Sequence, residues 1–246
     1  MTYVMSDLHG RYDRYIAMLD KIKFSENDTL YVLGDCIDGV DGSEPVKLLK
    51  DMMRRKNVIN LQGNHEFWAL PLLRPLMKIS FEDYGVIGYR NYRFGKVDCD
   101  LGSWLSFGGD VTFEQFVSLP KSEIAELLDY MSGWGFYMDI TVNGKRYIMS
   151  HSGVHDYHSS VLAKLHKVSP REWTFNRRGI YYHCRYFSEH DNVYLVTGHI
   201  ASERIDPNFR GKIFRSENHI VVDTGTTYGR STGCLCLETN EEFYVS

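Results

Sequence analysis

The sequence predicts an α/β protein, and three observations support this class. Strand-like segments alternate with amphipathic helical segments near the N-terminus. Polar turns rich in Gly, Asp, Asn and His follow the strand-like segments. Hydrophobic residues make up 43% of the chain and charged residues 24%, which is the balance of an ordinary globular protein. A chain of 246 residues can bury one substantial core, so we expect a single domain over residues 1–246.

The N-terminal part contains three predicted strands and two predicted helices. Branched and aromatic residues predict strands over residues 2–6, 29–33 and 58–61. Apolar residues at the spacing of one helical face predict helices over residues 11–23 and 43–56. Strand, helix, strand, helix, strand is the order of a parallel βαβ core. The residues alone therefore favour a parallel sheet.

The rest of the chain divides into an insertion and a second group of strands. We expect a helical and loop insertion at about 67–131, with one clear helix over residues 121–132. Predicted strands at 137–142 and 146–149 flank Asn143-Gly144, which is a strong hairpin signal. Further strands are expected over residues 193–196, 219–222, 234–237 and 242–245.

Composition and charge exclude several classes of protein. No stretch approaches the roughly 18 apolar residues of a membrane span, and no basic-then-apolar signal peptide opens the chain. We therefore expect a cytoplasmic protein with no membrane partner. The five cysteines form no CxxC pair, so neither a zinc knuckle nor a disulfide framework is indicated. A net charge of −4 gives no signal for nucleic-acid binding.

Polar residues with metal-ligand chemistry follow the predicted strands. Each one alone is compatible with a helix cap or a turn, but their joint occurrence is not explained that way. Ligands in open α/β sheets collect beyond the carboxyl ends of the strands. Carboxylate oxygens combined with imidazoles suit Mn, Fe or Zn better than Mg or Ca. The residues are Asp7, His9, Asp35, Asp38, Asn64, His65, His151 and His199.

These ligands are too many for one ion, so two metal ions that share a carboxylate are the economical arrangement. Such pairs, about 3.5–4 Å apart, clamp the attacking and leaving oxygens of an in-line displacement. Phosphoryl transfer needs this kind of positioning and charge stabilisation. The residues therefore predict a hydrolase of phosphate esters or anhydrides.

Five motifs in this order resemble the calcineurin-like metallophosphoesterases, in particular the branch of bacterial serine/threonine phosphatases and symmetrical diadenosine tetraphosphatases. The resemblance covers nearly the whole chain, and the tail motif Val222-Asp223-Thr224-Gly225 is also similar to that branch. It implies a β-sandwich flanked by helices, so the strictly parallel arrangement is relaxed. The motifs are Ser6-Asp7-Leu8-His9-Gly10, Gly34-Asp35-Cys36-Ile37-Asp38, Gly63-Asn64-His65-Glu66, Ser150-His151-Ser152-Gly153 and Gly198-His199.

The resemblance implies a role for each motif residue. Asp7 and His9 would bind the first of two divalent ions, with Mn²⁺ expected and Fe or Zn as alternatives, and Asp35 would bridge both ions. His65 would act as general acid on the leaving group or as a donor to the phosphoryl oxygens, held by Asp38. The second ion would be completed by Asn64, His151 and His199.

The chain departs from the resembled pattern at Gly39. Many relatives have an arginine at this place, where it grips the phosphate, and glycine has no side chain to donate such hydrogen bonds. Other residues must therefore bind the phosphate, or the phosphate is bound more weakly. The candidate arginines are Arg177, Arg178 and Arg11, followed by Arg74 and Arg90.

The motifs leave the substrate open. The first hypothesis is a phosphatase that hydrolyses phosphomonoesters or phosphoproteins by in-line attack of a metal-bound hydroxide. The alternative is a hydrolase of nucleotide polyphosphates such as diadenosine tetraphosphate. A non-catalytic binding protein on a phosphatase fold is the third, although no metal ligand is missing. Several aromatic residues could stack on an adenine or fill a small core: Trp104, Phe107, Trp173, Phe175, Tyr181 and Tyr182.

Overall fold

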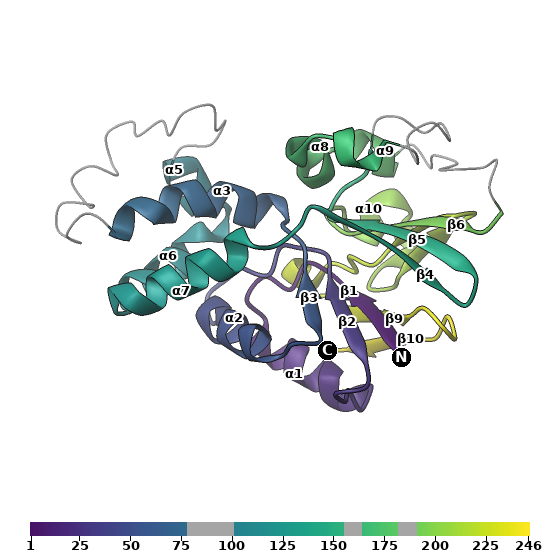
Figure 1. The fold of residues 1–246 in the computed structure, drawn as a ribbon, viewed down its shortest axis with the longest axis horizontal. Coiled ribbons are helices and arrows are strands. Elements are labelled where there is room, and N and C mark those ends of the chain that lie inside the picture. The colour runs from purple at the N-terminus through teal and green to yellow at the C-terminus, as the bar shows by residue number, and fades with distance from the viewer. Residues whose placement is uncertain (78–100, 155–163, 182–190) are drawn as a thin grey trace.

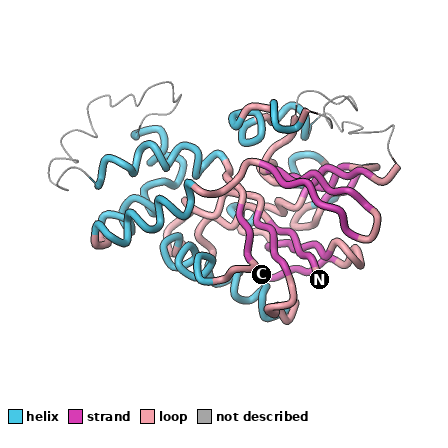
Figure 2. The backbone as a smooth tube through the Cα atoms, viewed as in Figure 1, coloured by secondary structure: helices cyan, strands magenta, loops and turns pink. Residues whose placement is uncertain are grey.

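Two five-stranded sheets pack face to face, and helices cover their outer faces (Figure 1). The computed structural model describes residues 1–77, 101–154, 164–181 and 191–246. Both sheets mix parallel and antiparallel strands, which Figure 2 draws in magenta between the cyan helices. The predicted class, a β-sandwich flanked by helices, is confirmed.

The first sheet has the order β10-β9-β1-β2-β3. Its parallel part consists of β1 (Thr2–Met5), β2 (Thr29–Val32) and β3 (Val58–Asn60), as the strand–helix alternation predicts. The C-terminal strands β9 (Thr232–Cys236) and β10 (Glu242–Val245) extend the sheet in the antiparallel direction. The chain therefore returns at its end to complete the sheet with which it began.

The second sheet has the order β4-β5-β6-β8-β7. Its central strands β5 (Lys145–Ser150), β6 (Val193–Thr197) and β8 (His219–Val221) are parallel, and the edge strands β4 (Tyr137–Val142) and β7 (Phe214–Ser216) are antiparallel to them. The strictly parallel arrangement that the residues favoured is therefore wrong. The local pattern shows which segments are extended, but not which strands pair across an edge.

The predicted hairpin between β4 and β5 is present. Asn143 and Gly144 at its tip have φ angles of 47° and 76°. Positive φ at both central positions is what a type I′ turn requires, and its twist matches that of the flanking strands. The turn residues therefore determined this connection locally.

Side chains alternate between two core layers along the strands. Val4 belongs to the apolar layer between the sheets, whereas its neighbours Tyr3 and Met5 belong to the layer beneath the helices. Met149 likewise packs between the sheets, and Ile148 packs on the opposite face. Strands that are buried on both faces appear as continuous apolar runs in the sequence, and their two faces become distinct only in the folded sandwich.

The helices surround the sandwich, and those between β3 and β4 form a group beside the sheets, at the left of Figure 1. Helices α1 (Tyr12–Lys21) and α2 (Pro45–Arg54) follow the predicted positions with shorter ends. Between β3 and β4 the longer helices are α3 (Asn64–Leu73), α6 (Asp110–Val117) and α7 (Lys121–Ser132), and α7 has the predicted bounds. The shorter elements are η1 (Arg74–Met77), α5 (Leu101–Trp104), η2 (Leu105–Gly109), η4 (Leu165–Lys167), α8 (Pro170–Phe175), α9 (Arg177–Tyr181), α10 (Ser202–Ile205), η5 (Pro207–Phe209) and η6 (Thr226–Tyr228).

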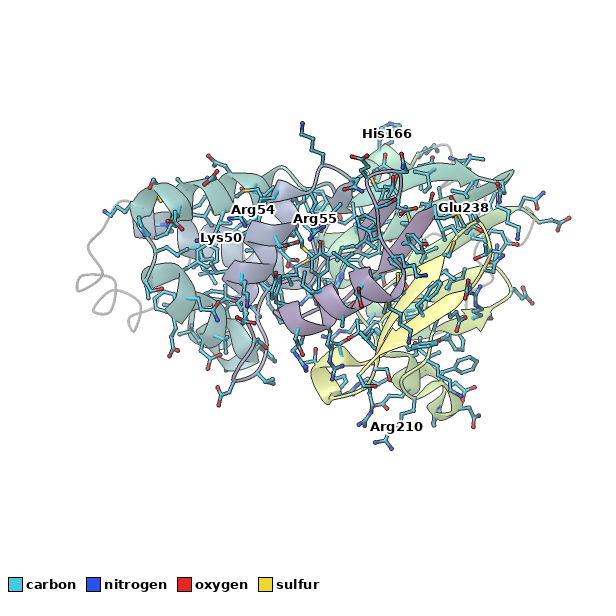
Figure 3. The ribbon with its side chains drawn as sticks, turned by 90° about the horizontal axis from the view of Figure 1, so that it is seen from below. Lys50, Arg54, Arg55, His166, Arg210 and Glu238 are labelled. Atoms are coloured by element: carbon cyan, nitrogen blue, oxygen red, sulfur yellow. The ribbon has the colours of Figure 1, made fainter. Side chains whose placement is uncertain are left out.

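Basic side chains on the outer face of α2 are largely paired with acids. Figure 3 shows Lys50, Arg54 and Arg55 along this helix. Lys50 forms an ion pair with Glu123, and Arg55 forms one with Asp51. These pairs reduce the positive charge that this face presents to solvent. Among the described residues, no helix has both the length and the apolar character that a membrane crossing requires.

A single buried carboxylate holds two of the loops that follow the strands of the first sheet. Glu66, fully buried near the start of α3, accepts hydrogen bonds from the backbone N–H groups of Asp35, Cys36 and Ile37 at 3.0, 2.7 and 3.2 Å. It also accepts one from Gly63, the residue before α3, at 2.8 Å. Hydrogen bonds to a charged acceptor are stronger than neutral ones, so this carboxylate ties the β2 loop to the start of α3.

We expect Glu66→Gln to destabilise the protein by about 2–3 kcal/mol, because an amide places an N–H₂ group against backbone donors that need an acceptor. The free energy of unfolding in urea measures this loss. Glu126→Gln, on the exposed side of α7, is the matched control and should be close to neutral. Equal stability of the two variants would contradict the role given to Glu66.

Candidate metal centre

Loops from both sheets converge at the carboxyl ends of the parallel strands. The β1, β2 and β3 loops of the first sheet meet the β5 and β6 loops of the second sheet at this edge. Each loop begins within a few residues of its strand, so the sheets themselves set the positions of the side chains. The converging residues are Asp7, His9, Asp35, Asn64, His65, His151 and His199.

Asp35 lies at the centre of this group. Its Oδ2 is 3.3 Å from Nε2 of His151, 3.8 Å from Nε2 of His65 and 3.9 Å from Nε2 of His9. Its Oδ1 accepts a hydrogen bond from the backbone N–H of His65 at 3.1 Å. One carboxylate oxygen is therefore fixed by the backbone, and the other faces three imidazoles. A carboxylate placed in this way can serve two cations at once.

His151 is oriented by a bond on its far side. The ring is fully buried, and its Nδ1 donates to the carbonyl oxygen of Leu33 at 2.8 Å. A carbonyl can only accept, so this contact places a hydrogen on Nδ1 and turns Nε2 inward, where it can bind a metal ion once it has lost its own proton. There Nε2 lies 3.0 Å from Oδ1 of Asn64 and 3.1 Å from Nδ1 of His199. Three potential metal-binding atoms, Nε2 of His151, Oδ1 of Asn64 and Nδ1 of His199, therefore lie close together.

Two groups of three donor atoms are present among the described residues. One consists of His9, Asp35 and His65, and the other of Asp35, His151 and His199. Asp35 is common to both. Asp7 is next to these groups: its Oδ2 accepts the backbone N–H of His199 at 3.0 Å. The structure thus brings together all the predicted ligands, and it adds His65 to the donors around the first group.

Asp223 is a buried carboxylate of this edge to which no role was given from the sequence. It follows β8 by two residues and is 6% exposed. Burial, together with the charge of Asp35, raises the pKa of Asp223 to about 6, although the hydrogen bond from the Gly225 backbone opposes the rise. Asp223 has the same sequence pattern as the predicted ligands, because it is a polar residue that follows a strand.

The buried carboxylates and imidazoles of the centre shift one another's pKa values. Burial alone would raise the pKa of Asp35, but His151 and His65 hold it well below its usual range. Burial opposes protonation of these two imidazoles, yet Asp35 outweighs it and raises the pKa of His65 to about 10 and of His151 to about 9. Burial and the charge of His65 lower the pKa of His9 to about 3. In the absence of metal, protons on two imidazoles balance the carboxylates.

The donor set fits divalent metal ions. Imidazole nitrogens combined with carboxylate and amide oxygens suit Mn, Fe or Zn. The buried inward oxygens of Asp35 and Asn64 lie within 3.3 Å of His151 Nε2, and a cation bound there would take the place of the His151 proton. One ion would be held by Asp35, Asn64, His151 and His199, and the other by Asp7, His9 and Asp35.

The loops hold these residues in an unusual backbone conformation. Positive φ is uncommon outside glycine and is tolerated best by Asp, Asn and His. Strained backbone of this kind concentrates at functional sites, where the surrounding contacts pay for it. The residues concerned are Asp7 at 55°, His9 at 47°, Asp35 at 52°, Asp38 at 63° and His199 at 69°.

His65 and Asp38 form the pair that the sequence predicts. Nδ1 of His65 and Oδ2 of Asp38 are 2.6 Å apart, which leaves Nε2 of His65 toward the donor cluster. Two residues of the insertion support Asp38. The indole N–H of Trp104 donates to the same Oδ2 at 2.7 Å, and the hydroxyl of Thr112 accepts from the Asp38 backbone N–H at 2.8 Å. No sequence signal pointed to these supports.

Comparison with known proteins decides the family. A model of the calcineurin-like phosphoesterases matches residues 2–203, which include the whole donor cluster. This chain belongs to the calcineurin-like phosphoesterase family. The predicted resemblance is therefore confirmed.

Relatives and solved structures of this phosphoesterase agree with the assignment. A protein of Wigglesworthia glossinidia brevipalpis named symmetrical bis(5'-nucleosyl)-tetraphosphatase is 36% identical over 83 residues, which are 33% of this chain and 30% of that protein. A protein of the same name from Buchnera aphidicola is 27% identical over 156 residues, 62% of this chain and 44% of that protein. The matches thus span less than half of the length of these relatives.

Two solved structures share the fold across almost the entire chain. One, assigned provisionally as a diadenosine tetraphosphatase, has a TM-score of 0.62 at 13% identity and covers 99% of this chain and 92% of its own. The other, a metallophosphoesterase from Sphaerobacter thermophilus, has a TM-score of 0.51 at 16% identity and covers 100% and 87%. At this identity the likeness establishes the fold.

The candidate arginines occupy different places around the donor cluster. Nε of Arg177 donates to Nε2 of His199 at 3.3 Å, so this side chain reaches the centre. Arg178 is exposed on the same short helix, α9. Arg11 forms an ion pair with Asp13 and lines a cavity of about 100 Å³ together with His9. Arg74 bonds Ser132 instead, and Arg90 lies outside the described residues.

The candidate aromatic residues differ in their exposure. Trp104 and Trp173 are 0% and 1% exposed, and the ring of Trp173 stacks on Tyr137, so both belong to cores. Phe107 is 62% exposed, and Phe175 is partly exposed. Neither Tyr182 nor the side chain of Tyr181 is among the described parts of the chain. Exposure next to the centre therefore singles out Phe107 and Phe175.

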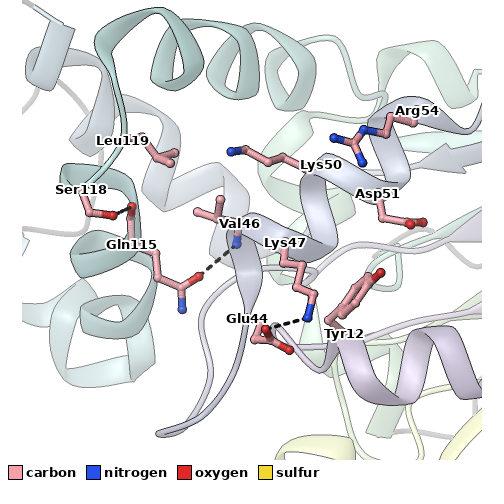
Figure 4. Close-up of a pocket in the computed structure, with 10 residues that line it drawn as sticks. All are labelled: Tyr12, Glu44, Val46, Lys47, Lys50, Asp51, Arg54, Gln115, Ser118 and Leu119. Atoms are coloured by element: carbon pink, nitrogen blue, oxygen red, sulfur yellow. Dashed lines mark hydrogen bonds and ion pairs between the residues drawn. The ribbon is translucent and has the colours of Figure 1, made fainter.

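A groove of about 560 Å³ lies apart from the donor cluster, between α2 and α6 (Figure 4). Tyr12, Lys50, Arg54 and Gln115 are among its lining residues, and none of the proposed metal ligands lines it. Its lysines are engaged: Lys47 pairs with Glu44 and lies over the ring of Tyr12. We therefore assign the chemistry to the strand ends and not to this groove.

We expect Gly198→Ala to reduce metal content, because a Cβ at this position would overlap Oγ of Ser6 and Oδ2 of Asp7. Displacement of Asp7 would weaken one metal site, and elemental analysis of the purified protein measures the loss. Gly133→Ala is the matched control, since its Cβ would meet no atom closer than 3.4 Å. Full metal content in Gly198→Ala would contradict the expectation that crowding of Asp7 weakens the site.

We expect Trp104→Phe to lower kcat about tenfold, because Asp38 loses one of its two side-chain donors and no longer orients His65 firmly. Steady-state hydrolysis of a phosphate ester with added Mn²⁺ measures the change in kcat, and KM should stay within about twofold of the value for the unaltered protein. Trp173→Phe is the control: this indole N–H is buried and has no hydrogen-bond partner among the described residues. Equal losses in both variants would indicate a packing effect only.

Proposed function

We propose that this phosphoesterase hydrolyses nucleotide polyphosphates of the dinucleoside tetraphosphate type. The observation that carries the proposal is the carboxylate of Asp35, whose Oδ2 faces the imidazoles of His9, His65 and His151 within 3.9 Å. Family membership supports the reaction class. The names of the relatives support the nucleotide substrate, since both are symmetrical bis(5'-nucleosyl)-tetraphosphatases.

Two divalent ions are proposed as cofactors, with Mn²⁺ as the first choice. The ligands are those given above, and Asp35 is the residue that both ions share. Bound there, such ions supply Lewis acidity to the phosphoryl group and to water. The protein supplies a dry, rigid set of donors, because Asp35 and His151 are each held by a backbone group on the side that faces away from the centre.

His65 is proposed as the proton donor to the leaving group. Its Nδ1 is fixed by Asp38, so a proton at Nε2 faces the reacting atoms. The nearby carboxylates favour the protonated ring, which is the form that a general acid needs. Arg177 is proposed to bind phosphate oxygens from the His199 side, and Arg11 from the His9 side, with Arg178 as a weaker candidate. Together they would replace the arginine that is absent at Gly39.

The other two hypotheses receive less support. A phosphomonoesterase would use the same residues, but the relatives are named for dinucleoside tetraphosphates, and nothing in the comparisons points to a phosphoprotein substrate. A non-catalytic protein on this fold would be expected to lack a ligand or to hold the ligands apart. Here the predicted donors are all present and lie within reach of one another.

We expect purified protein with Mn²⁺ to convert diadenosine tetraphosphate into ADP as its sole nucleotide product. Chromatography of the products tests both the substrate and the symmetry of cleavage. Activity should disappear with EDTA and return with Mn²⁺, and Asp35→Asn should lose at least about 10³-fold, since the shared ligand is removed.

Parallel assays with p-nitrophenyl phosphate and a phosphoserine peptide separate the alternatives. A higher kcat/KM for either compound than for diadenosine tetraphosphate would overturn the proposed substrate, but it would not contradict the proposed metal centre. Metal-independent turnover, or full activity of Asp35→Asn, would overturn the proposed centre itself.

A further inference from the structure

Three aromatic rings from distant parts of the sequence meet beside the donor cluster. The ring centroid of Trp68, on α3, is 6.0 Å from that of Phe107 in η2 and 5.2 Å from that of Phe175 in α8. The ring planes are inclined by 33° and 48°. In Figure 1, α3 lies at the left, beside the sheets, and α8 lies above the second sheet. We call Trp68, Phe107 and Phe175 the aromatic platform.

The platform borders the proposed reaction site at two points. The rings of Trp68 and His65 are 6.2 Å apart, on the same face of α3. Phe175 precedes Arg177 by two residues, and Arg177 donates to His199. A ligand whose phosphates lie between His65 and Arg177 would therefore have the platform next to its non-phosphate part.

Core packing does not account for Phe107. It is 62% exposed, whereas Trp104 three residues earlier is 0% exposed and completes the core beneath it. A single exposed ring is ordinary, but exposed rings that touch one another form contiguous apolar surface of the kind that marks binding sites, and Phe107 touches the partly buried ring of Trp68. Trp68 and Phe175 are also only partly buried, which leaves accessible ring surface on the platform.

The contact between Gly39 and Gly108 holds Phe107 in place. The backbone N–H of Gly39 donates to the carbonyl of Gly108 at 3.1 Å. A Cβ on Gly108 would lie 2.5 Å from the carbonyl oxygen of Gly39, and a Cβ on Gly39 would lie 2.5 Å from that of His9. A side chain at Gly108 would therefore push the Phe107 segment away from Gly39, and a side chain at Gly39 would collide with His9 and Ser43. The loop that carries Gly39 thus lies directly against the segment that carries Phe107.

We propose that the aromatic platform binds a nucleobase of the substrate by stacking. The inference rests on the nucleotide class of substrate proposed above and adds the residues that select it. Flat, exposed rings of Trp and Phe stack on purines and pyrimidines alike, because every base has a π-face. A phosphomonoester or an inorganic polyphosphate has nothing to place there.

The first test compares substrates with and without a base. We expect Phe107→Leu to raise KM for diadenosine tetraphosphate about tenfold and to leave KM for inorganic tripolyphosphate within about twofold. Phe107→Tyr, which keeps the ring, should behave like the unaltered protein. Equal effects of Phe107→Leu on both substrates, or no effect on the dinucleotide, would overturn the platform.

The second test does not need catalysis. Isothermal titration of the metal-free protein in EDTA should show weaker binding of ADP by Phe107→Leu than by the unaltered protein and Phe107→Tyr, with pyrophosphate binding unchanged. ADP binding that depends on the ring would uphold the platform even if diadenosine tetraphosphate is not hydrolysed, in which case only the proposed function fails. ADP binding that is undetectable, or equal in all three proteins, would overturn the platform whatever the hydrolysis assay shows.

Discussion

The buried carboxylate of Glu66 is the interaction on which the arrangement of the centre depends. It takes one backbone N–H from Gly63 and three from the loop that begins at Asp35. These donors would otherwise be unpaired in a region closed to water, which is costly for each group. The same side chain therefore stabilises the fold and sets the relative position of the β2 loop and α3, which carry Asp35 and His65.

Because these loops are held in place, the candidate ligands can lie in short loops close to the ends of the strands. Asp7, His9, Asp35 and His199 adopt positive φ soon after their strands, so the backbone turns sharply there and presents these side chains at the sheet edge. Neighbouring loops share hydrogen bonds, for example from the backbone N–H of His9 to the carbonyl of Asp35 at 2.9 Å and from Gly198 to His151 at 3.0 Å. The strain is local, and the network that opposes it spans both sheets. These hydrogen bonds position the candidate metal ligands through contacts within the protein alone.

Residues of the segment between β3 and β4 contact two residues of the β2 loop, Asp38 and Gly39. Trp104 and Thr112 hold Asp38, and Gly108 docks on Gly39. The family resemblance made Gly39 look like a loss, because an arginine stands there in many relatives. In the folded protein this position is a contact between two backbones that leaves no room for a side chain. Gly39 offers no side chain to a phosphate. In the proposals above, Arg177 contacts the phosphate and the aromatic platform contacts the base.

The sequence by itself determined the α/β class and the hairpin at Asn143-Gly144, and it predicted the candidate donor residues that the structure brings together. Each of these depends on a local pattern: apolar periodicity, turn chemistry, or a polar residue soon after a strand. The sandwich arrangement was implied by the family resemblance of the motifs. The sequence did not determine the antiparallel edges of the sheets or the supports of Asp38. Trp104 is 66 residues from Asp38, and the three rings of the platform come from three separate segments. Contacts of this kind depend on how the sandwich and the insertion pack together, and packing between distant segments leaves no periodic signal in either one. Tertiary structure alone decided them.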